Sequence, residues 1–339
     1  MASLHEESFY CIPETKLTLP ERPVYCGVAI AAAVLGLGGA GCQVVRWRSR
    51  LSRAAQRRRP SPNPVIVFCL ALSDFMACIG VIARAVGILV FDPPLEVRPG
   101  VYVPTQGITA IYVGSTIEIV NLYFYSATYM WTLVYAIDIT MQLKNTDVPI
   151  SLYHVLCWTA PAVFVGLSMF SVFFEVPKAP GQDIQQCAAG FHLVLHYIFS
   201  YTPIVAVMLA NPAIYITASR LLEITVRPML GRYTQRERQV ISAIKIKFLL
   251  IVVIFTLCWL PNVIDGVIQI SLIKDDHMGD RFFALWIIEA ALNPLQGLLN
   301  CLAYGPETFQ QWLMGRTGWL LRSRQPVNLD TREADPLLR

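Results

Sequence analysis

The chain has 339 residues, of which 55% are hydrophobic and 15% are charged. Soluble domains carry about a quarter charged residues, so this composition excludes an ordinary soluble protein and predicts one that crosses a membrane several times. The formal net charge of +4 reflects arginine-rich loops and therefore does not indicate a nucleic-acid-binding protein.

Seven apolar segments are long enough to cross a membrane, because a hydrocarbon core about 30 Å thick needs roughly 20 residues per helix. In chain order they are residues 24–45, 65–91, 108–142, 152–174, 193–222, 243–273 and 282–304. We therefore predict an all-α membrane protein, with a seven-transmembrane-helix bundle at residues 24–304. A short N-terminal arm, residues 1–23, precedes the bundle.

The basic loops predict the orientation of this bundle. Arginines dominate residues 46–63, which contain no acid, and the third inner loop: Arg46, Arg48, Arg50, Arg53, Arg57, Arg58, Arg59, Arg220, Arg227, Arg232, Arg236 and Arg238. By the positive-inside rule these loops are cytoplasmic, which places the N-terminus in a lumen or outside the cell and the C-terminus in the cytoplasm. Such loops also attract anionic lipid, so they do not by themselves identify a protein partner.

The second predicted helix holds two ionisable residues at membrane depth, Asp74 near its middle and Arg84 toward its outer end. A charge inside a bilayer costs a few kcal/mol and is tolerated mainly in a polar interior. Asp74 is either an acid held by polar partners on neighbouring helices or a switch that takes an ion or a proton. Arg84 either snorkels to the outer headgroups or binds a ligand carboxylate.

The third predicted helix carries a polar stripe whose members are three or four residues apart, so that they share one face. The stripe comprises Glu118, Asn121, Tyr125, Thr128, Thr132 and Tyr135. We expect this face to line the bundle interior. Asp138 follows at the inner end, where it either pairs locally or holds the resting-state contacts of a receptor.

The sixth and seventh predicted helices each combine an internal proline with a polar face. Pro261 lies shortly after Trp259, and Pro294 directly follows Asn293. Each proline removes a backbone donor and kinks its helix, which makes the sixth helix a candidate moving part. The other polar residues on these faces are Asn262, Asp265 and Gln269 in the sixth helix and Glu289, Gln296 and Asn300 in the seventh.

The C-terminal region predicts a surface helix and a targeting signal. Residues 305–324 intersperse apolar residues with arginines, as in a short amphipathic helix on the inner membrane surface. Residues 325–339 form a tail in which Glu333 precedes Leu337 and Leu338. This pattern resembles the endolysosomal sorting signals that clathrin adaptors bind. Leu221 and Leu222 are a second candidate pair, unless they simply end the fifth helix.

Several strings together resemble the layout of rhodopsin-like G-protein-coupled receptors, namely LALSDF, Trp158, CWLP and Asn293-Pro294. Longer strings are similar to the ocular albinism type 1 receptor family: FYSATYMWTLVYAIDI, LYHVLCWTAP, MLANPAIY, GRYTQRERQVISAIKIKF, CWLPNVID and ALNPLQGLLNCLAYG. The similarity covers most of residues 65–305. The combination is far more specific than any one of these motifs.

The resemblance implies a receptor of melanosome and lysosome membranes, partly at the plasma membrane, that couples to heterotrimeric G proteins. It also implies L-DOPA or a related tyrosine-derived amino acid as ligand. Carried onto this chain, it makes Trp259 and Pro261 the moving core of the sixth helix and Asn293 with Pro294 the matching element of the seventh. Asp74 would be the interior polar partner of both.

The chain departs from the rhodopsin-like pattern in three respects, one of which is Gly297 where a tyrosine is common. Ile139 follows Asp138 where most such receptors have an arginine, so the usual acid–arginine lock is absent. No cysteine lies between Cys78 and Cys157 to form the usual bridge with Cys187, which leaves Cys11 or Cys26 as its partner. Cys11 with Cys187 is the candidate disulfide, and Cys26 stays open as the alternative partner.

For a ligand site we select the outer halves of the polar stripes. An amino acid needs an anion for its ammonium group and a donor for its carboxylate. The candidates that could supply them are Arg84, Glu118, Asn121, Asp265, Gln269 and Glu289. The alternative is that these buried groups only satisfy one another.

Other functional classes fit this sequence less well than a receptor. A lysosome-related transporter of small amino acids would also use polar stripes and broken helices, although no inverted repeat is apparent. A retinal-binding protein would need a lysine in residues 282–304, which contain none. The histidines and acids form no clustered nucleophile or metal set, so we expect neither an enzyme nor a metal or cofactor.

Overall fold

The computed structural model describes residues 21–56, 63–91, 108–173, 191–226, 235–271 and 279–304. These ranges form seven α-helices: α2 (Glu21–Gln56), α3 (Pro64–Phe91), α4 (Ile108–Leu143), α5 (Ile150–Phe173), α6 (Phe191–Val226), α7 (Gln235–Ser271) and α8 (Gly279–Tyr304). The all-α prediction is confirmed. Residues 305–339, which include the predicted amphipathic helix and tail, lie outside the described residues.

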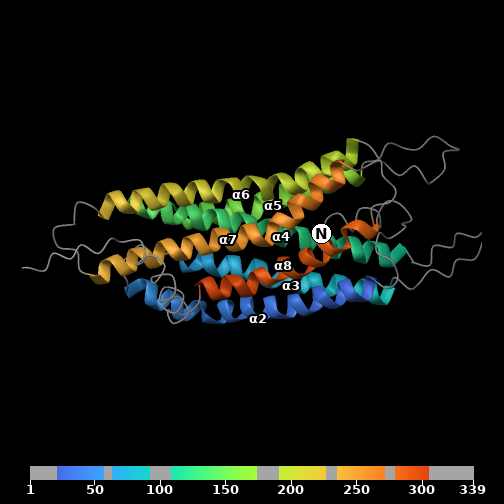
Figure 1. Ribbon diagram of the computed structural model, residues 1–339, viewed down its shortest axis with the longest axis horizontal. Coiled ribbons are helices and arrows are strands. Elements are labelled where there is room, and N and C mark those ends of the chain that lie inside the picture. Colours follow the sequence, from blue (N-terminus) through green and yellow to red (C-terminus); the bar gives the residue numbers. More distant parts are fainter. Residues whose placement is uncertain are drawn as a thin grey trace, which may run out of the picture. The chain divides into compact units, whose positions relative to one another are not determined.

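The seven helices close into a bundle. Each helix contacts the next along the chain, and α8 returns to pack on α2, so the contacts form a ring. Further contacts join α4 to α6 and α3 to α8 across it. Figure 1 shows the helices side by side, with α2, α3 and α8 adjacent. A helix satisfies its own backbone hydrogen bonds, which is why helices suit a chain of this composition in lipid.

Six of the seven helices are long and apolar enough to cross a membrane, and α4 is the exception. Its length is sufficient, since it runs from Ile108 to Leu143. The predicted polar stripe lowers its apolarity, because that stripe puts an acid, an amide and several hydroxyl groups into the middle of the helix. In the bundle these side chains are covered by neighbouring helices, so α4 passes through the interior of the bundle.

Helix α7 shows most clearly how each helix divides its surface. One face exposes only aliphatic side chains: Leu249, Val253, Leu257, Leu260, Ile264 and Val267. The opposite face buries Phe255, Trp259, Asn262 and Asp265. A long exposed apolar stripe is unfavourable in water and favourable against lipid tails. The predicted helix with one wet side is therefore confirmed, and its wet side faces the interior.

Candidate functional site

The centre of the candidate site is Arg84 of α3, which lies inside the bundle and is only 7% exposed. Its Nε atom lies 3.7 Å from the Glu118 carboxylate of α4, an ion pair. None of its three guanidinium nitrogens has a hydrogen-bond acceptor among the described residues. Each buried donor left in this way costs about 1–3 kcal/mol. Arg84 therefore does not snorkel to the headgroups, and its donors are available to a ligand.

Two more polar groups without partners lie on the same face of α4. The amide oxygen of Asn121 and the hydroxyl of Tyr125 are buried and have no hydrogen-bond partner among the described residues. Asn121 fits against α3 because Gly80 has no side chain there, and a Cβ on Gly80 would lie 2.8 Å from Asn121 Oδ1. Gly80 is one helical turn from Arg84, so the three unsatisfied groups belong to one α3–α4 contact.

Two further carboxylates approach this cluster from α7 and α8. Glu289 lies within electrostatic range of both Arg84 and Asp265. Asp265 accepts a hydrogen bond of 3.1 Å from the indole nitrogen of Trp286, and both acids are at most 1% exposed. Two acids, Glu118 and Glu289, therefore lie near Arg84, and Asp265 lies near Glu289. The side chain of Gln269, the sixth predicted ligand residue, lies outside the described residues.

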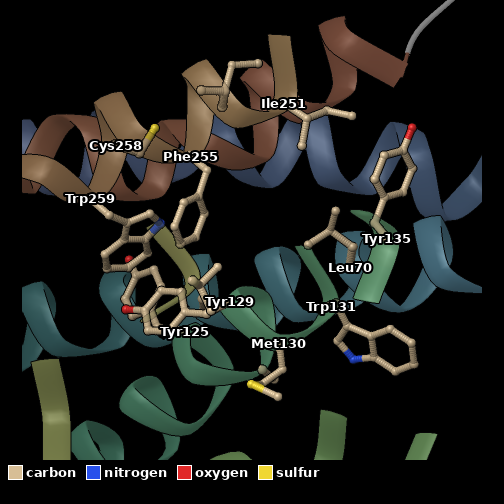
Figure 2. Close-up of a cluster of buried hydrophobic side chains, with 14 of the residues drawn as sticks. Leu70, Tyr125, Tyr129, Met130, Trp131, Tyr135, Ile251, Phe255, Cys258 and Trp259 are labelled. Carbon is tan, nitrogen blue, oxygen red and sulfur yellow. The ribbon is translucent and has the colours of Figure 1, made fainter. Parts of the chain in front are cut away.

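An aromatic layer lies next to these charges. The Trp259 ring of α7 packs edge-on against two tyrosines of α4, with centroids 5.0 Å from Tyr125 and 4.5 Å from Tyr129. Phe255 extends the layer, 5.9 Å from Tyr129. Figure 2 shows Trp259, Phe255 and the two tyrosines converging on one point between α4 and α7. Tyr125 therefore belongs both to the polar cluster and to the aromatic layer.

Asp74 forms a separate polar centre of its own. Its carboxylate accepts hydrogen bonds from Thr128 of α4, at 3.0 Å, and from Asn300 of α8, at 2.9 Å. This is the first of the two arrangements expected for Asp74, an acid held by polar partners on neighbouring helices. The resemblance implied Trp259 and Asn293 as its partners instead. In the described residues Asp74 bonds to neither, because Asn300 lies two helical turns beyond Asn293 and occupies that place.

The residues implied as moving parts pair with each other between α7 and α8. The Trp259 indole donates to Gln296 at 2.5 Å. Asn262 and Asn293 exchange two hydrogen bonds, of 2.8 and 3.1 Å. With the Trp286–Asp265 bond these make a ladder along the two antiparallel helices. The two asparagines of this ladder are sequence neighbours of the two prolines: Asn262 follows Pro261, and Asn293 precedes Pro294.

Asp138 pairs locally at the end of the bundle where α3 begins. It accepts hydrogen bonds from the backbone N–H of Asn63, at 3.2 Å, and from Gln142, at 2.7 Å. Asn63 itself caps α3 by accepting from the Val65 N–H at 3.0 Å. The carboxylate therefore fixes the start of α3 to α4, without any arginine. Of the two roles expected for Asp138 from the sequence, the structure shows local pairing.

The remaining predicted residues divide into two groups. Leu221 is half-buried in α6 and packs against the hydrophobic core, the location expected if the pair ends the fifth transmembrane helix. Cys26 is a buried free thiol. No three His, Cys, Asp or Glu side chains gather as metal ligands within the described ranges. The others lie outside the described residues: Cys11, Cys187, Glu333, Leu337, Leu338 and the side chain of Leu222.

Several residues of the site were not singled out from the sequence as site residues. Trp286, Gln296 and Asn300 share the polar face of α8 with Glu289, and Thr128 belongs to the α4 stripe, so periodicity signalled them. Gly80 is different, because its role depends on what faces it across a helix contact. Nothing in the α3 sequence alone marks the residue that will face Asn121.

Comparison with known proteins gives the family. The model of the ocular albinism type 1 protein family matches residues 1–319. The human protein "G-protein coupled receptor 143" is 25% identical over 315 residues, covering 87% of this chain and 75% of that protein.

Two Dictyostelium discoideum proteins, "Cyclic AMP receptor-like protein A" and "Cyclic AMP receptor-like protein B", are each 23% identical, over 54% and 75% of this chain. The matches cover about half of those two proteins, 45% and 52%. The family match spans nearly the whole chain and includes every helix described above. The chain therefore belongs to the ocular albinism type 1 protein family.

Proposed function

We propose that this protein is a G-protein-coupled receptor of melanosome and lysosome membranes that senses a tyrosine-derived amino acid such as L-DOPA. Family membership and the human relative support the receptor class. They also confirm that the chain is not an enzyme. The ligand, the organelle and the coupling to heterotrimeric G proteins are the parts that we propose.

The observation that carries the ligand proposal is the buried Arg84 guanidinium, which finds no hydrogen-bond acceptor in the part of the chain that the structure describes. A guanidinium presents a planar set of donors that matches a carboxylate, and such charge-assisted bonds are strong. Leaving these donors unpaired is costly, whereas a ligand carboxylate would satisfy two of them at once. An amino-acid carboxylate supplies that group.

The acids around Arg84 suit the other end of the same ligand. Glu118 lies beside Arg84, and Glu289 lies within electrostatic range of Arg84 and Asp265. These acidic side chains can balance an ammonium group. The aromatic layer of Tyr125 and Trp259 lies beside these charges and suits an aromatic side chain. The three features together fit an aromatic amino acid in its zwitterionic form.

This site also supplies a route to the rest of the bundle. Tyr125 contacts Trp259, and Trp259 donates to Gln296 of α8. A ligand that displaces Tyr125 would therefore shift the contact between α7 and α8. The response is a population shift, which requires the ligand to bind one arrangement more tightly than the other.

The first test removes the guanidinium and the ligand carboxylate separately. Arg84→Gln should weaken L-DOPA binding by at least tenfold, because a charge-assisted pair is worth about 1.5–3 kcal/mol. Dopamine, which lacks the carboxylate, should bind the parent and the variant equally. Binding of both compounds to purified receptor in nanodiscs measures this.

Two further variants address the ammonium group. Glu118→Gln and Asp265→Asn should each weaken both compounds, since both carry the amine. Asn211→Ala is the matched control, because Asn211 is a buried unsatisfied amide on α6 and is not part of the cluster. Unchanged L-DOPA affinity in Arg84→Gln would rule out this site.

A further inference from the structure

Helix α2 contributes no residue to the ligand site described above, yet its first turns lie against the same cluster. It packs on α3 and on α8, the helices that carry Arg84 and Glu289. The side chains of Tyr25 and Cys26 are only 3% and 0% exposed, and Cys26 lies within electrostatic range of Arg84. The beginning of α2 therefore turns these two side chains into the bundle rather than toward lipid.

Tyr25 is the α2 residue with the most contacts to the charges of this site. Its phenol group lies within electrostatic range of Arg84, Glu118 and Glu289. From the side of α4, the phenol group of Tyr125 lies within range of both Tyr25 and Arg84. Two tyrosine hydroxyls, from two different helices, therefore lie near the same guanidinium.

The charges of the site limit how a ligand carboxylate can be bound there. Glu118 lies 3.7 Å from Arg84, and Glu289 lies within range of the same arginine. A carboxylate bound to Arg84 would therefore lie near groups of its own charge, which weakens its binding. A second cation would repel the ammonium group of an amino acid, whereas a neutral hydroxyl donor stabilises the carboxylate without that repulsion.

A carboxylate also accepts more hydrogen bonds than Arg84 alone donates to it. Its two oxygens offer about four acceptor sites, of which a bidentate guanidinium fills two. The Tyr125 hydroxyl is buried and has no hydrogen-bond partner among the described residues, so its donor is available. The hydroxyls of Tyr25 and Tyr125 thus match the acceptor sites that Arg84 would leave free.

We propose that Tyr25 is a specificity-determining residue of the ligand site, and that its hydroxyl donates, together with that of Tyr125, to a ligand carboxylate held by Arg84. Helix α2 then recognises the acid end of the ligand and favours a compound that has a carboxylate over the same compound without it. This inference rests on the ligand site of the proposed function. A tyrosine that only filled space between α2, α3 and α8 would be replaced by phenylalanine without effect on this preference.

Three related compounds test the proposal with one conservative variant. L-DOPA has a carboxylate and an amine, dopamine lacks the carboxylate, and dihydrocaffeate lacks the amine. Tyr25→Phe should weaken the binding of L-DOPA and of dihydrocaffeate by about tenfold each, because each carboxylate loses one charge-assisted hydrogen bond. Dopamine should bind the parent and the variant equally. Binding to the full-length protein in nanodiscs measures all three affinities.

Tyr153→Phe is the matched control. The Tyr153 hydroxyl is also buried without a hydrogen-bond partner among the described residues, but it belongs to α5 and lies within electrostatic range of Asp138. Its removal should leave the affinities for all three compounds unchanged. Tyr25→Leu is a second variant without the hydroxyl and should also lower the ratio of L-DOPA affinity to dopamine affinity, which keeps the proposal testable if Tyr25→Phe fails to fold.

The outcomes separate this inference from the proposed function. Unchanged affinity of Tyr25→Phe for both carboxylates would overturn the inference, and so would an equal loss for all three compounds, because a packing defect gives that result. If L-DOPA does not bind the parent protein, the proposed function is contradicted, and dihydrocaffeate still tests the role of Tyr25. If neither carboxylate binds the parent, the inference is overturned as well.

Discussion

At the scale of single residues, Asp74 illustrates how a buried acid is kept in a membrane bundle. Both of its oxygens accept a hydrogen bond from another helix, Oδ1 from Thr128 and Oδ2 from Asn300. Burying an acid is costly unless its acceptors are used. The Asp74 side chain thus joins α3 to α4 and α8. Its contribution to the stability of the protein should depend on Thr128 and Asn300.

A swap of acid and amide tests this pairing. Asp74→Asn should destabilise the receptor by about 1–3 kcal/mol, because the NH2 group of the new amide would face the NH2 group of Asn300 and the hydrogen bond between them would be lost. Asp74→Asn combined with Asn300→Asp should recover most of that loss, since the acceptor then lies on α8. Thermal unfolding of the purified protein measures both changes.

Ser73→Ala is the control for the swap. Ser73 is also fully buried, but its hydroxyl donates to the Cys69 carbonyl of its own helix at 3.0 Å. Its replacement should cost far less, because no contact between helices is lost. If the swap is no more stable than Asp74→Asn alone, the hydrogen bond to Asn300 does not hold the two helices together.

At the scale of elements, α7 and α8 are joined by polar pairs: Trp259 with Gln296, Asn262 with Asn293 and Asp265 with Trp286. Asn262 and Asn293 each donate to and accept from the other. Amide pairs of this kind are satisfied only when both partners are present. The pair therefore specifies the register of α7 against α8, which apolar packing would leave less defined.

A double-mutant cycle measures this pair. Asn262→Ala and Asn293→Ala should each destabilise by about 1–3 kcal/mol, because each removes both hydrogen bonds of the pair. The double variant should lose clearly less than the sum, since it removes the same two bonds only once. Thermal or denaturant unfolding of the four proteins gives the coupling energy.

Thr217→Ala is the control for this double-mutant cycle. The Thr217 hydroxyl is exposed and donates to the Ala213 carbonyl of its own helix at 2.9 Å, so its loss should be small and additive with either asparagine variant. Strict additivity between Asn262→Ala and Asn293→Ala would mean that the two amides act independently.

At the scale of the whole molecule, the proposed location and the proposed signalling can be separated experimentally. Leu337→Ala with Leu338→Ala should move the receptor to the cell surface, because clathrin adaptors would no longer retain it on the endolysosomal route. Adding L-DOPA to such cells should then activate a heterotrimeric G protein. Surface labelling and G-protein activation measure the two outcomes.

Val327→Ala with Leu329→Ala changes apolar residues of the same tail outside the acidic leucine motif and should leave the location unchanged. Retention of the dileucine variant inside the cell would contradict the sorting signal alone. Surface arrival without a ligand-dependent signal would contradict the receptor proposal and favour the transporter. Uptake of labelled amino acid into reconstituted vesicles would then be the next measurement.

Much of the fold was predictable from the sequence, and α7 shows why. Its exposed aliphatic face and its buried polar face follow directly from residue spacing, because a helix presents residues three and four apart on one side. The same rule located Glu118, Asn121, Asp265 and Glu289 on interior faces. Their burial was therefore expected from periodicity before any contact between helices was known.

Pairing between helices was not predictable in the same way. The motif resemblance assigned Asp74 to Trp259 and Asn293, whereas the helix positions give it Thr128 and Asn300. A shift of two turns along α8 changes which amide faces which acid, and sequence spacing contains no information about such a shift. Gly80 acquired its role for the same reason, from the Asn121 side chain that lies opposite it.

The sequence by itself determined that this chain crosses a membrane as a seven-helix bundle with a polar interior, because both features follow from composition and from spacing within single helices. Only the tertiary structure decided that the Arg84 donors lack acceptors among the described residues and that Asp74 bonds to Thr128 and Asn300. These properties depend on distances between helices that are far apart in the chain. Such distances are determined by packing, which no single segment encodes alone.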